Sequence, residues 1–245
     1  MSTPSDSEST GTEITREIET TPAPDGAPKM LVEIWSDIAC PWCYIGKRRF
    51  EQALADFPHR DALDVVWRSF ELDADAPKTA GLPTVELLAV KYRIPVEKAQ
   101  AMMDSMTATG AADGITFRFD ISISGNTFDA HRLIHFADTR GKRTEMVERL
   151  FAAYFTEGLA LANHETLVRL AADVGLDAEE ATIALSTDGY SKDVRADERR
   201  ATELGITGVP FFAIDERYGI SGAQPASALV EALSQAYFEF TDTQS

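Results

Sequence analysis

The two cysteines of this 245-residue chain stand close together, as Cys40-Pro41-Trp42-Cys43. Two thiols at this spacing can cycle between a dithiol and a disulfide. A structural zinc site needs four ligands and an iron–sulfur cluster normally needs four thiolates, and the sequence has no second cysteine pair to supply them. The motif therefore favours thiol–disulfide chemistry that needs no metal and no organic cofactor.

The position of the pair, between a predicted strand and a predicted helix, suits a reactive thiol. Residues 31–35 are apolar except for Glu33 and predict a β-strand. Apolar residues after the pair recur with helical spacing, at Phe50, Ala53, Leu54 and Phe57. A helix N-terminus stabilises a thiolate through its partial positive charge and unpaired N–H groups. We therefore expect Cys40 to be the exposed nucleophile and Cys43, in the first turn, to resolve the mixed disulfide. Pro41 suits this helix start because it lacks an N–H that would be unpaired there.

The other elements place strands near the two ends of the chain and helices between them. Residues 63–70 predict a second strand, so the first part of the chain reads as strand, helix, strand. Between about 77 and 187 the hydrophobic pattern is helical, with Asn163 and Asp177 as predicted N-caps. A polar helix and two strands are then predicted over 190–204, 209–214 and 218–221, before a last helix.

Composition excludes several classes of function. With 40 acidic residues against 23 basic ones the net charge is −17, so the surface is acidic and we expect no nucleic-acid partner. No segment approaches the roughly 18 consecutive apolar residues of a membrane-spanning helix, so we expect no membrane insertion. Residues 1–29 lack the apolar region of a secretory signal, which predicts a disordered acidic tail and a cytoplasmic location.

Two histidines, His131 and His135, are four residues apart on a predicted helix and could face one metal ion. They flank an apolar face that contains Ala130 and Ile134. We interpret them as ordinary helix residues and predict no metal site.

Further segments complete the pattern around the cysteine pair. The motif follows a first strand, a long helical insert comes next, and Gly208-Val209-Pro210 precedes the last two strands. Three segments carry a more specific signal: Ser36–Cys43, Asn126–Leu133 and Ser221–Gln224. From about residue 30 to about residue 237, the chain resembles the DsbA family of thioredoxin-fold oxidoreductases, in its FrnE-like cytoplasmic branch.

The resemblance implies an α/β fold: a thioredoxin fold with a large all-helical insertion. The thioredoxin-like domain is discontinuous, over 30–76 and 187–240, and the inserted helical domain covers 77–186. An acidic tail over 1–29 precedes both.

The resemblance also implies roles for residues outside the motif. Pro210 is expected to be cis and to face the cysteine pair, with the backbone of Val209 binding an extended substrate segment. Gly222 and Gln224 are expected to bind substrate beside it. Alignment with the first strand of the family places Glu33 where a buried acid could relay the proton of the second cysteine. An exposed acid at a sheet edge is the alternative.

As to function, the resemblance implies a thiol–disulfide oxidoreductase or isomerase acting on protein or low-molecular-weight thiols and disulfides. The best-known exported branch has His where this chain has Trp42, so an extreme oxidising potential is not implied. A sister branch has Ser in place of Cys40 and binds glutathione to isomerise small aromatic compounds, so glutathione is a candidate co-substrate. Two alternatives stay open: a glutathione-dependent isomerase or transferase of this fold, and a redox-regulated chaperone.

Overall fold

A sheet of four strands lies at the centre of the described residues, 28–79 and 81–243, of this computed structural model. The strands are β1 (Met30–Ser36), β2 (Leu63–Ser69), β3 (Phe211–Ile214) and β4 (Tyr218–Ser221). Their order is β2-β1-β3-β4, with β1 parallel to β2 and the other pairs antiparallel. The predicted tail, apart from residues 28 and 29, lies outside the described residues.

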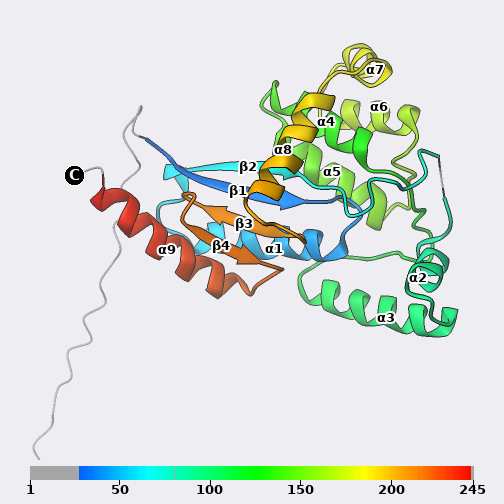
Figure 1. Ribbon diagram of the computed structural model, residues 1–245, viewed down its shortest axis with the longest axis horizontal. Helices are drawn as coiled ribbons and strands as arrows, with labels where there is room; N and C mark the ends of the chain where they lie inside the picture. Colours follow the sequence, from blue (N-terminus) through cyan, green and yellow to red (C-terminus); the bar gives the residue numbers. More distant parts are fainter. Residues whose placement is uncertain (1–27, 80, 244–245) are drawn as a thin grey trace, which may run out of the picture.

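Helices cover both faces of this sheet (Figure 1). In chain order, the helices that precede β3 in the described residues are α1 (Pro41–Asp56), the short 3-10 helix η1 (Arg60–Ala62), α2 (Thr84–Tyr92), α3 (Val96–Ala112), α4 (Phe128–Asp138), α5 (Arg143–Phe155), α6 (His164–Asp173), α7 (Ala178–Ser186) and α8 (Ser191–Glu203). The last helix is α9 (Ala226–Asp242). In Figure 1, α1 and α9 lie on one side of the sheet and α8 on the other. None of the helices in the described part of the chain is both long and apolar enough to cross a bilayer.

Strand β1 is buried on both faces by these helices. Val32 and Ile34 join the large core cluster that also contains residues of α1 and α9, whereas Trp35 packs with Ala201 of α8. The Trp35 Nε1–H donates to the main-chain oxygen of Asp197, at 3.0 Å. A strand covered on both sides needs apolar residues on both, which explains why β1 reads as an almost continuous apolar run.

The helical insert forms where the sequence predicts it, since α2 to α7 all fall between residues 77 and 186. Both predicted N-caps are confirmed: Asn163 accepts from the N–H of Thr166 and Asp177 from that of Glu180, at 3.0 and 2.9 Å. Figure 1 shows α2 and α3 as a hairpin set apart from α4 to α7. The division into two domains stays a prediction.

The insert and the sheet share one continuous hydrophobic cluster. Tyr44 of α1 joins them directly, because its ring stacks on that of Phe151 in α5 with centroids 4.8 Å apart. The Tyr44 hydroxyl also donates to Glu148 of α5, at 2.9 Å. The helix that begins with the cysteine pair is therefore anchored to the insert as well as to the sheet.

Strand β3 is shorter than expected, beginning at Phe211 rather than at Val209. Pro210 has no N–H to donate to a strand ladder, so the regular pairing starts after it. The Val209–Pro210 peptide is cis, as the family resemblance implied. The N–H of Gly222 donates to the carbonyl oxygen of Pro210 at 2.8 Å, which places the end of β4 beside this peptide.

Candidate active site

The cysteine pair lies at the start of α1. Cys40 is the N-cap residue and Pro41 the first helical residue. The N–H groups of Cys43 and Tyr44 donate to the carbonyl oxygen of Cys40, at 3.0 and 3.4 Å. The predicted placement of Cys43 in the first turn is therefore confirmed, and both thiols lie at the positive end of the helix dipole.

The two thiols differ in their surroundings. Cys43 belongs to the core and is 1% exposed. Burial, and then the neighbouring Cys40, raise the pKa of Cys43 well above its ordinary value. Cys43 is therefore a neutral thiol at neutral pH.

The expected exposure of Cys40 needs correction, because only 5% of this residue is exposed. It lines a cavity of about 670 Å³ between the start of α1, the α2–α3 hairpin and the end of α5. Trp42 also lines this cavity and is 44% exposed, so it lies at the cavity's edge. The helical pattern alone did not show that the segment ending at Val209 packs against Cys40. Cys40 faces this cavity rather than the open surface of the protein.

The segment before β3 reaches the cysteine pair. The Cys40 thiol donates to the carbonyl oxygen of Val209, with Sγ 3.7 Å from that oxygen. The expectation that Val209–Pro210 faces the pair is thereby confirmed. The side chain of Gln224 instead donates to the carbonyl oxygen of Ser221 at 2.9 Å, within its own loop. Substrate binding by Val209, Gly222 and Gln224 stays a prediction.

Gly46, in the second turn of α1, is a site residue that the sequence analysis missed. A Cβ at this position would lie 2.9 Å from Cγ of Pro210 and 3.6 Å from Cβ of Ala223. Only glycine lets α1 approach Pro210 so closely. The available signal was a glycine inside an amphipathic helix, where it costs about 1 kcal/mol relative to alanine and so indicates a packing requirement.

We expect Gly46→Ala to impair activity more than stability. Overpacking costs about 1–3 kcal/mol and the better helix propensity returns about 1 kcal/mol, so the free energy of unfolding should fall by at most about 2 kcal/mol. Disulfide exchange should slow further, because displacing Pro210 moves the Val209 carbonyl that contacts Cys40. Urea unfolding and stopped-flow exchange measure the two effects. Gly208→Ala, where a Cβ meets nothing within 4 Å, is the control; equal rates in both variants would contradict the packing argument.

Glu33 is buried and held by two arginines. Its carboxylate accepts from Nε of Arg68 at 2.9 Å and from Nε and Nη2 of Arg200 at 2.9 and 2.7 Å. Burial rules out the alternative of an exposed edge acid. Glu33 lies on the face of β1 that α8 covers, and within the described residues its hydrogen bonds go to arginines rather than to Cys43. The relay role stays a prediction.

Asp37, in the turn between β1 and α1, is a second residue that the sequence analysis missed. It is buried and lines the large cavity. Its carboxylate accepts from the N–H groups of Ala39 and Leu72 at 3.2 and 2.7 Å, and Oδ1 lies 3.6 Å from Nε2 of His131. Burial raises the pKa of Asp37, but His131 and the two N–H groups outweigh burial, so this pKa lies below its ordinary value. Asp37 therefore brings a negative charge to the wall of the cavity.

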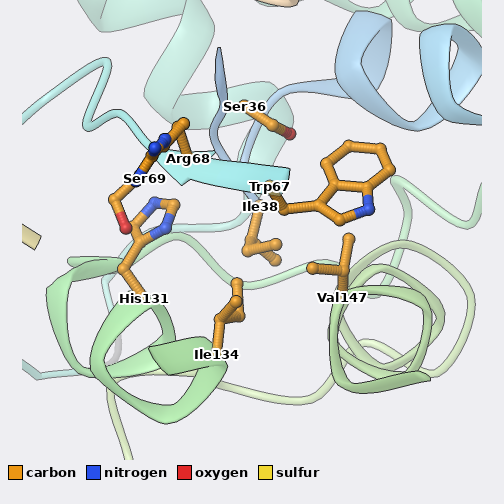
Figure 2. A pocket seen from close by; sticks show the side chains of 8 residues that line it. All are labelled: Ser36, Ile38, Trp67, Arg68, Ser69, His131, Ile134 and Val147. Atoms are coloured by element: carbon orange, nitrogen blue, oxygen red, sulfur yellow. The ribbon is translucent and has the colours of Figure 1, made fainter. Parts of the chain in front are cut away.

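The two histidines of α4 have separate environments. Figure 2 shows His131 pointing from α4 toward Arg68 and Ser69 of β2, beside a small cavity of about 10 Å³. His135 instead lies 3.0 Å from Oδ2 of Asp197 and 3.2 Å from Oγ of Ser69. In the part of the chain that the structure describes, no group of three potential metal ligands comes together. Each histidine therefore lies beside a different acid, His131 beside Asp37 and His135 beside Asp197.

Comparison with known proteins adds to this geometry. The model of the DSBA-like thioredoxin domain matches residues 31–234. The chain belongs to this family. The DsbA resemblance and the thioredoxin fold with a helical insertion, both inferred from sequence, are thereby confirmed. Membership in the DsbA-like family makes the protein a thiol–disulfide oxidoreductase in the general sense.

This DsbA-like protein is similar to several known proteins. A probable DsbA oxidoreductase of Streptomyces coelicolor is 49% identical, with a TM-score of 0.82 over 86% of this chain and 91% of its own. YwbO, an uncharacterised protein of Bacillus subtilis (strain 168), is 30% identical over 205 residues, 83% of this chain and 95% of YwbO. The fold is also that of the cytosolic disulfide reductase DsbM of Pseudomonas aeruginosa, solved with GSH, at 17% identity and a TM-score of 0.58 over 88% and 100% of the two chains.

Proposed function

We propose that this DsbA-like protein is a cytoplasmic oxidoreductase that exchanges disulfides with protein or low-molecular-weight substrates through Cys40 and Cys43. The observation that carries the proposal is the placement of Cys40 at the N-terminus of α1, with its thiol donating to the carbonyl oxygen of Val209. An extended substrate that binds the backbone of Val209 would have its disulfide beside Cys40.

The proposed cycle has two displacements. The Cys40 thiolate attacks one sulfur of a substrate disulfide, forms a mixed disulfide and releases the other sulfur as a thiolate. Cys43 then loses its proton and attacks Sγ of Cys40, which releases the second thiolate and leaves a Cys40–Cys43 disulfide. Two electrons pass from the protein to the substrate, and the reverse sequence oxidises a dithiol substrate. The cycle needs no metal and no organic cofactor.

The raised pKa of Cys43 suits this order of events. Part of the increase comes from the neighbouring Cys40, which competes with Cys43 for negative charge. When Cys40 is bonded to substrate it carries no charge, so this part disappears and Cys43 ionises more easily. Forming the mixed disulfide therefore lowers the pKa of Cys43, while the part of the increase that comes from burial remains.

Cys40 favours covalent exchange over the glutathione-dependent isomerase, because the sister branch that isomerises aromatic compounds with glutathione has Ser at this position. A redox-regulated chaperone would also need its thiols, so a refolding assay on the double cysteine variant separates that alternative. The proposal of a cytoplasmic location is supported by the likeness in fold to the cytosolic disulfide reductase DsbM. A cytoplasmic protein of this kind works in a reducing compartment.

The reduction potential of the cysteine pair tests the proposal. Protein equilibrated in glutathione buffers is quenched by alkylation, and mass spectrometry counts its free thiols. We expect Cys40 and Cys43 to titrate together as one two-electron couple within the cytosolic range of about −220 to −320 mV. A value near about −120 mV would identify an oxidant instead. Thiols that form no disulfide across this range would contradict the proposed cycle.

A further inference from the structure

The cavity beside Cys40 has the size and character of a small-molecule site. Its volume of about 670 Å³ lies within the range of about 300–1,000 Å³ that is usual for ligand cavities. Most of its wall is apolar, with contributions from Leu87, Leu88, Met102, Met103, Met106 and Phe155. Methionine side chains are flexible and polarisable, so such a wall adapts to apolar bodies of different shape.

Several hydroxyl groups interrupt the apolar wall, and one of them is that of Tyr154. Tyr154 and Thr84 both line the cavity, and their hydroxyl groups interact with each other. The pKa of Tyr154 is raised to about 12, mainly by burial. A hydrogen bond with Thr84 lowers this pKa, and the nearby charge of Asp37 raises it. The Tyr154 hydroxyl therefore stays protonated at neutral pH and can donate to an uncharged acceptor on a ligand.

The charges around the cavity do not suit an anionic ligand. Two carboxylates, Asp37 and Asp73, are among the lining groups. Lys91 also lines it, but its Nζ lies 3.6 Å from Oδ2 of Asp73, so its charge is largely offset. Glutathione carries two carboxylates and one ammonium group, and a charged body gains no compensation for lost hydration against leucine and methionine. The carboxylates disfavour an anion, and the apolar wall disfavours any charged body, so together they favour an uncharged ligand.

We propose that the cavity binds low-molecular-weight disulfides with uncharged, apolar bodies and presents one of their sulfurs to Cys40. The inference rests on the proposed function and names its substrate class. The Cys40 thiolate attacks one ligand sulfur, and the first apolar thiolate leaves and takes a proton from solvent. Cys43 then displaces the second one. Two electrons reduce one disulfide to two thiols, and an external dithiol such as dithiothreitol reduces the protein again.

Two aromatic disulfides of similar size test this specificity on the reduced full-length protein. Dithiodipyridine is uncharged and carries ring-nitrogen acceptors, whereas dithiobis(nitrobenzoate) is a dianion. Each stopped-flow rate is divided by the rate of the same reagent with free 2-mercaptoethanol. We expect the reaction with dithiodipyridine to saturate, with a normalised rate at least about tenfold above that of the dianion. Equal normalised rates, both rising linearly with concentration, would overturn the inference.

A variant that fills the cavity gives a second test. Met106→Trp should abolish saturation by dithiodipyridine and lower its normalised rate at least about tenfold. The matched control is Ser105→Trp, at the adjacent, exposed position of α3, and it should behave like the parent. Unchanged saturation in Met106→Trp would overturn the inference.

Two further variants complete the experiment, one as a substitute for Met106→Trp and one as a separate test of the proposed function. If Met106→Trp does not fold, as judged by circular dichroism, Tyr154→Phe replaces it. This variant lacks the hydroxyl that is proposed to bind the ring nitrogen of dithiodipyridine. The concentration of dithiodipyridine that gives half the maximal rate should therefore rise, and an unchanged value would count against the inference. Cys40→Ser should react with neither reagent. A Cys40→Ser protein that still reacted would refute the proposed function itself, independently of the cavity.

Discussion

Replacing Cys40 with serine should abolish disulfide exchange, whereas replacing Cys43 with serine should convert the protein into a trap for its substrates. Without a sulfur at the N-terminus of α1 no mixed disulfide forms, and turnover should fall at least about a thousandfold. In Cys43→Ser the nucleophile remains beside Val209 and the cavity. It still attacks, but nothing resolves the product, so the mixed disulfide accumulates.

Non-reducing electrophoresis and mass spectrometry of the two variants measure this difference. Equal capture of substrate by both would contradict the assignment of nucleophile and resolving thiol. The double variant, Cys40→Ser with Cys43→Ser, addresses the chaperone alternative. It should have neither turnover nor an effect on client refolding; retained refolding activity would favour a binding function independent of redox chemistry.

Asp197→Ala should lower the free energy of unfolding by about 3–5 kcal/mol, the cost of breaking a buried ion pair from one side. Its buried carboxylate accepts from the N–H of Ser69 at 2.9 Å and from Nη1 of Arg68 at 3.0 Å. In Asp197→Ala, the N–H of Ser69 and the guanidinium of Arg68, both in β2, lose the carboxylate of α8 that accepts their hydrogen bonds. Urea unfolding measures the loss. Glu203→Ala, exposed on the same helix, is the control and should change stability by no more than about 0.5 kcal/mol; similar losses in both would contradict the prediction.

The same carboxylate should make stability depend on pH in the acid range. Burial raises the pKa of Asp197, but His135, the N–H of Ser69 and Arg68 together bring it below the ordinary value of 3.8. As the pH falls, the unfolded chain takes up this proton before the folded protein does. The stabilisation is therefore complete at neutral pH and is lost below about pH 4. Asp197→Asn should accordingly lose less stability than the parent between neutral pH and about pH 3.

Most of the fold could be predicted from sequence patterns that act over a few residues. The apolar run before the motif, the helical spacing after it and the side chains of Asn163 and Asp177 act on residues within one or two turns, so their effect can be predicted without tertiary contacts. The element order follows from them. The cis peptide at Pro210 depended on family resemblance, because an isolated proline peptide is cis in only about 5–6% of cases in folded proteins.

Contacts between distant segments account for what the sequence did not show. Glu33 is held by Arg200, 167 positions away, and no local pattern identifies such a partner. Gly46 is required by Pro210, and Asp37 is held near His131, again across long separations. The burial of Cys40 has the same origin, since its thiol contacts the carbonyl oxygen of Val209, 169 positions away.

The stacking of Tyr44 on Phe151 has a consequence for how this protein diversifies. One helix carries both the thiols and an aromatic contact with the insert, so the insert is not a removable module. An exchange of inserts between relatives has to carry the matching surface of α1 with it. Substitutions on α5 can also reposition the thiols through α1. Two relatives with identical Cys-Pro-Trp-Cys motifs can therefore evolve different redox properties through residues that a motif search never inspects.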